Sequence, residues 1–276
     1  MKTIDLYEAF GIDRGDAIAG YLECYRHTPM SEMKPRIHPA ILIIPGGAYC
    51  MVAEHEGAGI AHQFLAMGYD CYVLQYDVAP HCYPTQLLQA GMAMAYLRDH
   101  AKELYLDEKH IAVMGFSAGG HLSGSISLLW DDQALCAIPG ENARLRPDAA
   151  VLCYPVVTSD ERYWHEQSIR NFCGDKVPFE NYSLEKRVRK DAPPVFLWTT
   201  SQDNGVPVQN SILLYSALQE AGVGAELHVF EQGWHGLATA DDECIDPSVA
   251  PFAYHVAHWK QLACEFLRGH GFVINA

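Results

Sequence analysis

Hydrophobic residues along this chain gather in short, nearly continuous runs that alternate with longer segments of helical periodicity. The run at residues 40–44 is Ala-Ile-Leu-Ile-Ile, and it ends at Pro45. Apolar runs of this kind are typical of strands that are covered on both faces in a parallel sheet. The predicted strands are residues 17–26, 40–44, 71–76, 110–115, 149–154, 195–200 and 225–230. The first alternates only loosely, so we expect it at an edge of the sheet.

Helices are predicted between these strands. They span residues 56–67, 84–101, 118–130, 208–221 and 252–267. Pro84 is well placed to open the second helix, and Gly68 to end the first. The regular alternation of strand and helix indicates an α/β fold, with a mainly parallel central sheet and helices on both faces.

One segment, residues 158–190, interrupts this rhythm. It contains no clear strand pattern, and it carries several aromatic residues and a basic cluster. Insertions of this length between two strands are more often functional than idle. We therefore interpret the chain as a single domain, residues 1–276, with a small cap inserted at about 158–190. The alternative is a solvated, partly helical excursion.

Charge narrows the choice of partners. The 276 residues include 34 acidic and 19 basic side chains, which gives a formal net charge of −15. A protein with this much negative charge repels nucleic-acid backbones and anionic lipid surfaces. No apolar run approaches the roughly 18 residues needed to cross a bilayer. We expect a small-molecule substrate, with no nucleic acid and no membrane as partners, and leave a homo-oligomer open.

Cysteine usage favours the cytoplasm. The nine cysteines are scattered and form no C-x-x-C pair, so they suggest neither a disulfide framework nor a zinc ribbon. The sequence also begins with Met-Lys-Thr-Ile-Asp, which has no apolar stretch that could serve as a signal peptide.

The most informative segment is residues 113–121, Val-Met-Gly-Phe-Ser-Ala-Gly-Gly-His. It contains the pattern G-x-S-x-G between a predicted strand and a predicted helix. In such a nucleophile elbow the serine takes a strained conformation, and glycines stand two residues either side because a Cβ would clash. The turn exposes the Ser117 hydroxyl. It also directs the N-terminus of the following helix at that hydroxyl, where free N–H groups can bind negative charge.

Together with Pro45-Gly46-Gly47-Ala48-Tyr49 upstream, this segment resembles the α/β-hydrolase esterases. Within them the chain resembles most the small bacterial acetyl-xylan esterase-like, sugar-ester hydrolase and lipase/esterase proteins. The resemblance extends from about residue 40 to the C-terminal helix. It implies an α/β-hydrolase fold and a catalytic triad in the chain order Ser, Asp, His.

A serine hydroxyl becomes a nucleophile only when an oriented base takes its proton. His235 is the predicted base, because it lies in a Gly-flanked loop just after the last strand. The rival His228 lies within that strand. Asp203 is the predicted acid, on a turn after the strand at 195–200, although an Asx turn or a helix cap would also explain it. Asp191 and Asp160 lie at the wrong end of that strand or too far away.

The oxyanion hole is expected in two places. Ala118, the residue after the nucleophile, offers one backbone N–H group. The family's His-Gly-Gly-Gly motif corresponds here to residues 45–48, where Pro45 and Ala48 replace the outer positions. Gly47 and Ala48 are therefore the expected donors, and Gly46 gives the turn its freedom. The proline removes a donor that could have braced this loop.

Three aromatic residues fall on loops expected around the serine, namely Tyr49, Trp164 and Trp234. They are candidates for a substrate-binding wall, and packed surface aromatics are the alternative. His121 lies a full helical turn beyond Ser117, so we expect it to pack or to hydrogen-bond beneath the site. The run at 54–56, Glu-His-Glu, lacks the spacing of a metal site. No metal and no cofactor are predicted.

These features predict a cytoplasmic serine esterase that cleaves short-chain acyl esters through an acyl-enzyme. The sugar part of the substrate, an acetylated sugar or oligosaccharide, is implied by the resemblance alone. One alternative is a peptidase of the prolyl-oligopeptidase type, but such enzymes carry a propeller domain for which 276 residues leave no room. Another is an inactive α/β-hydrolase that binds a ligand, which has no need of an intact Ser, Asp and His.

Overall fold

Eight strands form one sheet at the centre of the computed structural model, which describes residues 2–246 and 248–275. In spatial order the strands are β1 (Lys2–Asp5), β2 (Tyr21–Tyr25), β4 (Asp70–Gln75), β3 (His38–Ile44), β5 (Leu106–Phe116), β6 (Ala149–Cys153), β7 (Val195–Thr200) and β8 (Ala225–Phe230). The β1–β2 and β2–β4 pairs are antiparallel, and all other neighbours are parallel. The predicted mainly parallel sheet is confirmed.

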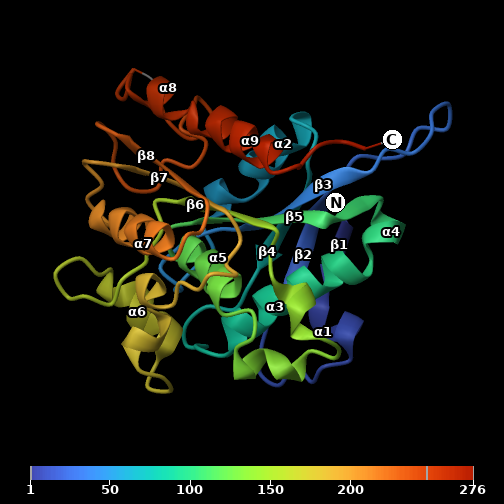
Figure 1. Ribbon diagram of the computed structural model, residues 1–276, viewed down its shortest axis with the longest axis horizontal. Coiled ribbons are helices and arrows are strands. Elements are labelled where there is room, and N and C mark those ends of the chain that lie inside the picture. The colour runs from blue at the N-terminus through green and yellow to red at the C-terminus, as the bar shows by residue number, and fades with distance from the viewer. Residues whose placement is uncertain (1, 247, 276) are drawn as a thin grey trace.

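Helices cover both faces of this sheet (Figure 1). On one side lie α2 (Ala58–Ala66), α8 (Ala253–Val256) and α9 (Trp259–Gly269); on the other lie α1 (Leu6–Phe10), α3 (Thr85–Asp99), α5 (Ala118–Leu128) and α7 (Gln209–Glu220). The remaining helical segments are α4 (Ala101–Leu104), α6 (Glu166–Cys173) and the 3-10 turns η1 (Glu54–Glu56), η2 (Gln133–Ala137), η3 (Asn142–Leu145), η4 (Phe179–Tyr182) and η5 (Leu184–Lys186). Among the described residues, no helix combines the length and apolar character that a membrane crossing requires.

Side chains alternate along each strand, so the sheet separates two hydrophobic cores. On β3, Leu42 and Ile44 contribute to the core beneath α3 and α5, whereas Ile41 and Ile43 contribute to the core beneath α2 and α9. All four side chains are fully buried. This two-sided burial explains why the central strands are continuously apolar in the sequence.

The predicted edge position of the first strand is wrong. That strand, β2, is shorter than the predicted residues 17–26. It pairs with β4 on one side and with β1 on the other, and Lys2 of β1 lies opposite Cys24. The edge strand is β1, which has only four residues and passes directly into α1. A strand this short has too little alternation to be found from the pattern of hydrophobic residues.

The segment 158–190 contains α6, η4 and η5, and its described residues form no strand. It packs against the body of the protein through Phe172, which lies 5.1 Å from the Tyr49 ring and 5.0 Å from the His121 ring, centroid to centroid. The Asn171 side chain donates a 2.8 Å hydrogen bond to the carbonyl of Ala48. The segment is therefore a packed part of the fold, in contact with the loop that follows β3.

The order of the strands places a topological switch point at the carboxyl edge of the sheet. β3 and β5 are neighbours, although the chain visits β4 between them, so the connections leave this pair toward opposite sides. Ligands of open α/β sheets bind at such a switch point, outside the carboxyl ends of the strands. The register pairs Ile44 with Gly115, which brings the loop after β3 next to the turn after β5.

Candidate active site

Ser117 lies on a sharp turn between β5 and α5. Its φ and ψ are 53° and −117°, a conformation that costs a non-glycine residue about 1–3 kcal/mol. A Cβ on Gly115 would lie 2.2 Å from the carbonyl oxygen of Gly119, and a Cβ on Gly119 would lie 2.1 Å from that of Ile44. The close approach predicted for both glycines is confirmed.

The structure brings the three predicted triad side chains together. His235 Nε2 is 2.7 Å from Ser117 Oγ, and His235 Nδ1 is 2.8 Å from Asp203 Oδ2. A carboxylate only accepts hydrogen bonds, so the proton of the neutral imidazole is on Nδ1. The lone pair of Nε2 then faces the serine hydroxyl, which donates to it.

Asp203 is held on both of its oxygens. Oδ1 accepts hydrogen bonds from the backbone N–H groups of Gly205 and Val206 at 2.9 and 2.8 Å, and this leaves Oδ2 for His235. The Asx turn that the sequence allows as an alternative therefore exists and orients the carboxylate. The side chain of Asp203 is only 1% exposed, whereas that of His235 is 22% exposed. The acid is thus shielded from water and the base remains accessible.

The backbone N–H groups of Ala118, Gly47 and Ala48 have no acceptor within residues 2–246 and 248–275, so they are free to bind an oxyanion. The loop lies against the nucleophile, since a Cβ on Gly46 would be 2.9 Å from Ser117 Cβ and 2.6 Å from the Phe116 carbonyl oxygen. Gly46 itself is not a donor to an oxyanion, because its N–H group already donates to Glu56 at 2.7 Å.

The substrate wall predicted from three aromatic residues needs correction. Tyr49 is fully buried, and its hydroxyl is 2.8 Å from His121 Nδ1, so it has no face to offer a substrate. The tight turn at Ala48 and Tyr49, both with positive φ, directs this ring into the core. Trp164 is half-buried against Phe179, and Trp234 is 41% exposed with its ring edge-to-face to Phe252. The binding role of Trp164 and Trp234 stays a prediction.

The other histidines occupy the predicted structural positions. His121 is fully buried beneath the site, with Nε2 2.8 Å from the carbonyl oxygen of Tyr182. Burial lowers the pKa of His121 to about 4, so the ring is neutral near pH 7. His228 lies on β8 and contacts Glu226.

Two residues for which the sequence analysis predicts no function lie directly behind the site. Glu56 is buried, and Tyr154, which follows β6, has its ring centroid 5.1 Å from that of His235. Nothing in the run Glu54-His55-Glu56 distinguishes the buried acid from the exposed one. The distinction depends on which side chain turns toward β6, and that is decided by the tertiary structure.

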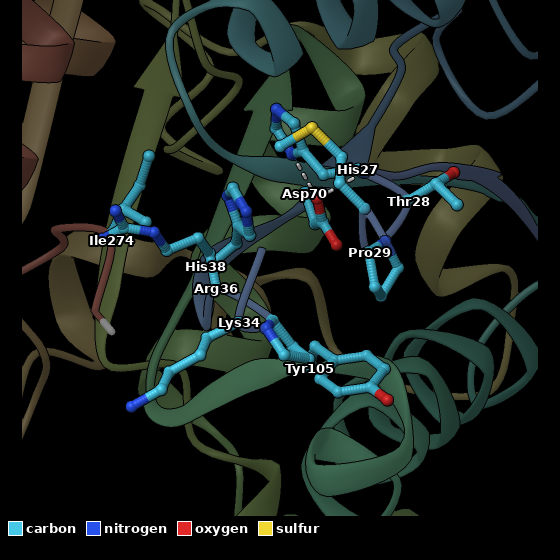
Figure 2. Close-up of a pocket in the computed structure, with 11 residues that line it drawn as sticks. His27, Thr28, Pro29, Lys34, Arg36, His38, Asp70, Tyr105 and Ile274 are labelled. Atoms are coloured by element: carbon cyan, nitrogen blue, oxygen red, sulfur yellow. Dashed lines mark hydrogen bonds and ion pairs between the residues drawn. The ribbon is translucent and has the colours of Figure 1, made fainter. Parts of the chain in front are cut away.

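A separate cavity of about 430 Å³ lies at the opposite, amino-terminal edge of the sheet (Figure 2). Its wall includes His27, His38 and Asp70, whose potential ligand atoms lie within 4.8 Å of one another. The two imidazole rings, however, are stacked with centroids 4.0 Å apart and planes 9° apart. A metal ion binds in the plane of each imidazole ligand, and two stacked parallel planes do not meet at one ion. The cluster therefore does not fit a shared metal.

Comparison with known proteins identifies relatives over most of the chain. A family model described as BD-FAE matches residues 27–218. An endo-1,4-beta-xylanase B of Butyrivibrio fibrisolvens is 38% identical over 212 residues, which are 74% of this chain and 33% of the relative. An acetylxylan esterase of Xylanibacter ruminicola is 34% identical over 209 residues, 72% of this chain and 41% of the relative. The chain thus spans well under half the length of these two relatives.

A solved structure matches nearly the whole chain. The acetyl ester-xyloside bifunctional hydrolase of Caldicellulosiruptor lactoaceticus superposes with a TM-score of 0.82 at 30% identity, and the match covers 99% of this chain and 97% of that one. The carboxylesterase Cest-2923 of Lactobacillus plantarum gives a TM-score of 0.77 at 25% identity, covering 92% and 94%. The α/β-hydrolase fold predicted from the resemblance is confirmed.

Proposed function

Because the chain belongs to the BD-FAE family of α/β-hydrolases, we propose that it is a serine esterase for short-chain acyl esters. The substrate we favour is an acetyl ester of a sugar or an oligosaccharide. The observation that carries this proposal is the hydrogen-bonded series Ser117, His235 and Asp203. The printed names of the acetylxylan esterase and of the acetyl ester-xyloside hydrolase support the acetyl and sugar parts.

The reaction follows from the positions of these groups. His235 Nε2 accepts the hydroxyl proton of Ser117 as Oγ attacks the ester carbonyl. The negative charge that forms on the carbonyl oxygen is bound by the N–H groups of Ala118, Gly47 and Ala48. Protonated His235, stabilised by Asp203, then gives its proton to the leaving alcohol oxygen. Water, deprotonated by the same imidazole, then attacks the acyl-enzyme. The bond between the acyl carbon and Ser117 Oγ breaks, His235 returns the proton to Oγ, and the carboxylic acid is released.

Trp164 and Trp234 are proposed to contact the alcohol part of the substrate. The exposed ring of Trp234 precedes the catalytic histidine, and a sugar ring stacks well on an indole face.

We further propose that residues 158–190 act as a cap. Support comes from His165, which belongs to this segment and is close enough to the catalytic base to be affected by it. Burial and the nearby His235 lower the pKa of the His165 imidazole.

A cytoplasmic location is favoured by nine free cysteine thiols, four of them buried.

Replacement of the nucleophile is the test of this function. Ser117→Ala is expected to lower kcat toward p-nitrophenyl acetate by about 10⁴–10⁶-fold without unfolding the protein. Ser125→Ala is the matched control, because this serine is buried on the same helix and its hydroxyl has no hydrogen-bond partner among the residues that the structure describes. A fluorophosphonate probe is expected to label Ser117 alone. Near-normal turnover in the Ser117→Ala variant would refute the proposal.

Panels of substrates test the proposed acyl chain length and the proposed sugar. The rate is expected to fall as the acyl chain lengthens from acetate to octanoate, and a preference for octanoate would overturn the short-chain assignment. A panel of acetylated mono- and oligosaccharides, compared with aryl acetates, tests the sugar. Cleavage of 4-nitroanilides of peptides in preference to esters would point to a peptidase instead.

A further inference from the structure

A buried carboxylate lies directly behind the proposed oxyanion loop. The side chain of Glu56 is 3% exposed, and both of its oxygens accept short hydrogen bonds. Oε2 accepts from the backbone N–H of Gly46 at 2.7 Å, and Oε1 accepts from the hydroxyl of Tyr154 at 2.7 Å. Neither the arrangement of the triad nor the reaction proposed above explains why an acid is buried here.

The first of these bonds completes the fixation of one peptide group. The Pro45 carbonyl oxygen accepts a 2.7 Å hydrogen bond from the Tyr76 hydroxyl, while the Gly46 N–H donates to Glu56. The peptide unit that joins Pro45 to Gly46 is therefore held at both its oxygen and its nitrogen. Two of the proposed oxyanion donors, Gly47 and Ala48, follow it immediately. Glu56 thus supplies the brace that the proline at position 45 cannot.

The second bond extends to the loop that carries the base. The Tyr154 hydroxyl donates to Glu56 and at the same time accepts a 2.9 Å hydrogen bond from the N–H of Ala238, three residues beyond His235. The Tyr154 ring also lies edge-to-face against the His235 imidazole, at 73° and 5.1 Å between centroids. One carboxylate therefore links the oxyanion loop to the histidine loop.

We propose that Glu56 is a positioning residue for catalysis, which acts on Gly47 and Ala48 through the Gly46 peptide and on His235 through Tyr154. The proposal rests on the serine-esterase function proposed above. Glu56 does not touch the substrate, so its contribution appears in the transition state rather than in substrate binding. Small displacements of catalytic groups cost up to about 10²-fold in rate.

Two substitutions at Glu56 separate the links. Glu56→Gln keeps the volume but has one acceptor oxygen, so it can serve either Gly46 or Tyr154 and not both. Glu56→Met removes both acceptors. We expect kcat to fall about 10-fold in the Gln variant and about 100-fold in the Met variant, with KM changed by less than about 2-fold. Glu54→Gln, the exposed neighbour in η1, is the control and is expected to be unchanged.

A transition-state analogue distinguishes positioning from a loss of folded protein. Active sites are counted with a fluorophosphonate, and the inhibition constant of phenylboronic acid, which forms a tetrahedral adduct with serine, is measured for each variant. We expect the inhibition constant to rise in proportion to the fall in kcat/KM. Unchanged kcat per active site and an unchanged inhibition constant in Glu56→Gln would overturn the proposal, whatever the melting temperature.

Tyr154→Phe provides a second test that does not alter the buried charge. It removes the hydroxyl link and keeps the ring against His235, so kcat is expected to fall about 5-fold. Combined with Glu56→Gln, its effect is expected to be less than additive, since both changes break one network. Strict additivity would contradict the shared network.

The two proposals fail in different ways. If the wild-type protein shows no Ser117-dependent ester hydrolysis, the esterase function is wrong. The labelling rate of Ser117 by the fluorophosphonate, which requires no natural substrate, then still tests Glu56. If hydrolysis depends on Ser117 but both Glu56 variants match the wild type in kcat and labelling rate, only the positioning role is wrong.

Discussion

At the scale of single residues, the site depends on side chains whose other hydrogen-bonding atoms are already occupied, so that each has one atom free for the catalytic contact. Oδ1 of Asp203 accepts hydrogen bonds from two backbone N–H groups, so only Oδ2 is free to accept one from His235. That bond fixes the imidazole tautomer and so directs a lone pair at Ser117. Gly205 permits this arrangement, because a Cβ there would lie 2.9 Å from His235 Cγ. Close packing and hydrogen-bond saturation together leave the base a single orientation.

His121 gives the protein a pH-dependent stability at the same scale. Burial lowers the pKa of His121 to about 4, against 6.5 for the free side chain. Between these pH values the unfolded chain binds a proton that the folded protein excludes, so stability falls as the pH decreases from 6.5 to 4. The full difference is worth about 3 kcal/mol. We expect His121→Gln, which cannot take up this proton, to lack that part of the pH dependence in urea unfolding between pH 4 and 7.

Tyr49→Phe is the control for this prediction. It removes the hydroxyl partner of His121 and leaves the ring buried, so the pH dependence is expected to persist. If the wild type and His121→Gln lose equal stability between pH 6.5 and 4, the assignment to His121 is wrong.

At the scale of elements, the active loops are fixed by contacts from segments far away in the sequence. The turn after β3 receives the Asn171 side chain from α6, which donates to the Ala48 carbonyl at 2.8 Å. The ring of the next residue, Phe172, packs on Tyr49, which directly follows Ala48 in that turn. The segment 158–190, proposed as a cap, therefore also holds the loop of the proposed oxyanion donors.

We expect Asn171→Ala to lower kcat/KM for p-nitrophenyl acetate about 5-fold. One hydrogen bond of this kind is worth about 1 kcal/mol, and its loss frees the carbonyl of Ala48. Asn181→Ala, an exposed substitution in η4 of the same segment, serves as the comparison and is expected to match the wild type. Equal rates for both variants would show that the contact from α6 has no effect on the loop.

At the scale of the whole molecule, the net charge of −15 acts on any charged substrate before it reaches the triad. Neutral esters of sugars are unaffected by this field, whereas anionic esters are repelled. We expect kcat/KM for 4-acetoxybenzoate to be lower than for neutral 4-acetoxybenzamide at low ionic strength. The ratio is expected to approach one as sodium chloride rises, because screening shortens the Debye length from about 30 Å at 0.01 M to about 3 Å at 1 M.

Steady-state kinetics of both acetates over this range of salt measure the effect. The neutral amide corrects for any influence of salt on the enzyme itself. A rate ratio that does not change with salt would mean that the overall charge has no influence at the site.

The sequence alone determined the central sheet, the elbow and the order of the proposed triad. Strands β3, β4, β6 and β7 and the second half of β5 are buried on both faces, so their apolar runs are visible without knowledge of their neighbours. The elbow is visible in a short stretch of sequence, because Gly115, Ser117 and Gly119 lie within five residues, although the close contact that requires Gly119 is with Ile44 on β3. Asp203 and His235 follow from the ends of two strands whose places in a parallel sheet are fixed by topology.

Only the tertiary structure decided the environment of those residues. Tyr49, which the sequence places beside the substrate, is turned into the core by the backbone at Ala48, and Glu56 is buried while Glu54 is exposed. The network of Glu56, Tyr154 and Ala238 joins positions as far apart in the chain as 56 and 238, and no periodicity encodes it. Burial and long-range hydrogen bonds depend on which surfaces meet after folding, and a pattern along one chain does not contain that information.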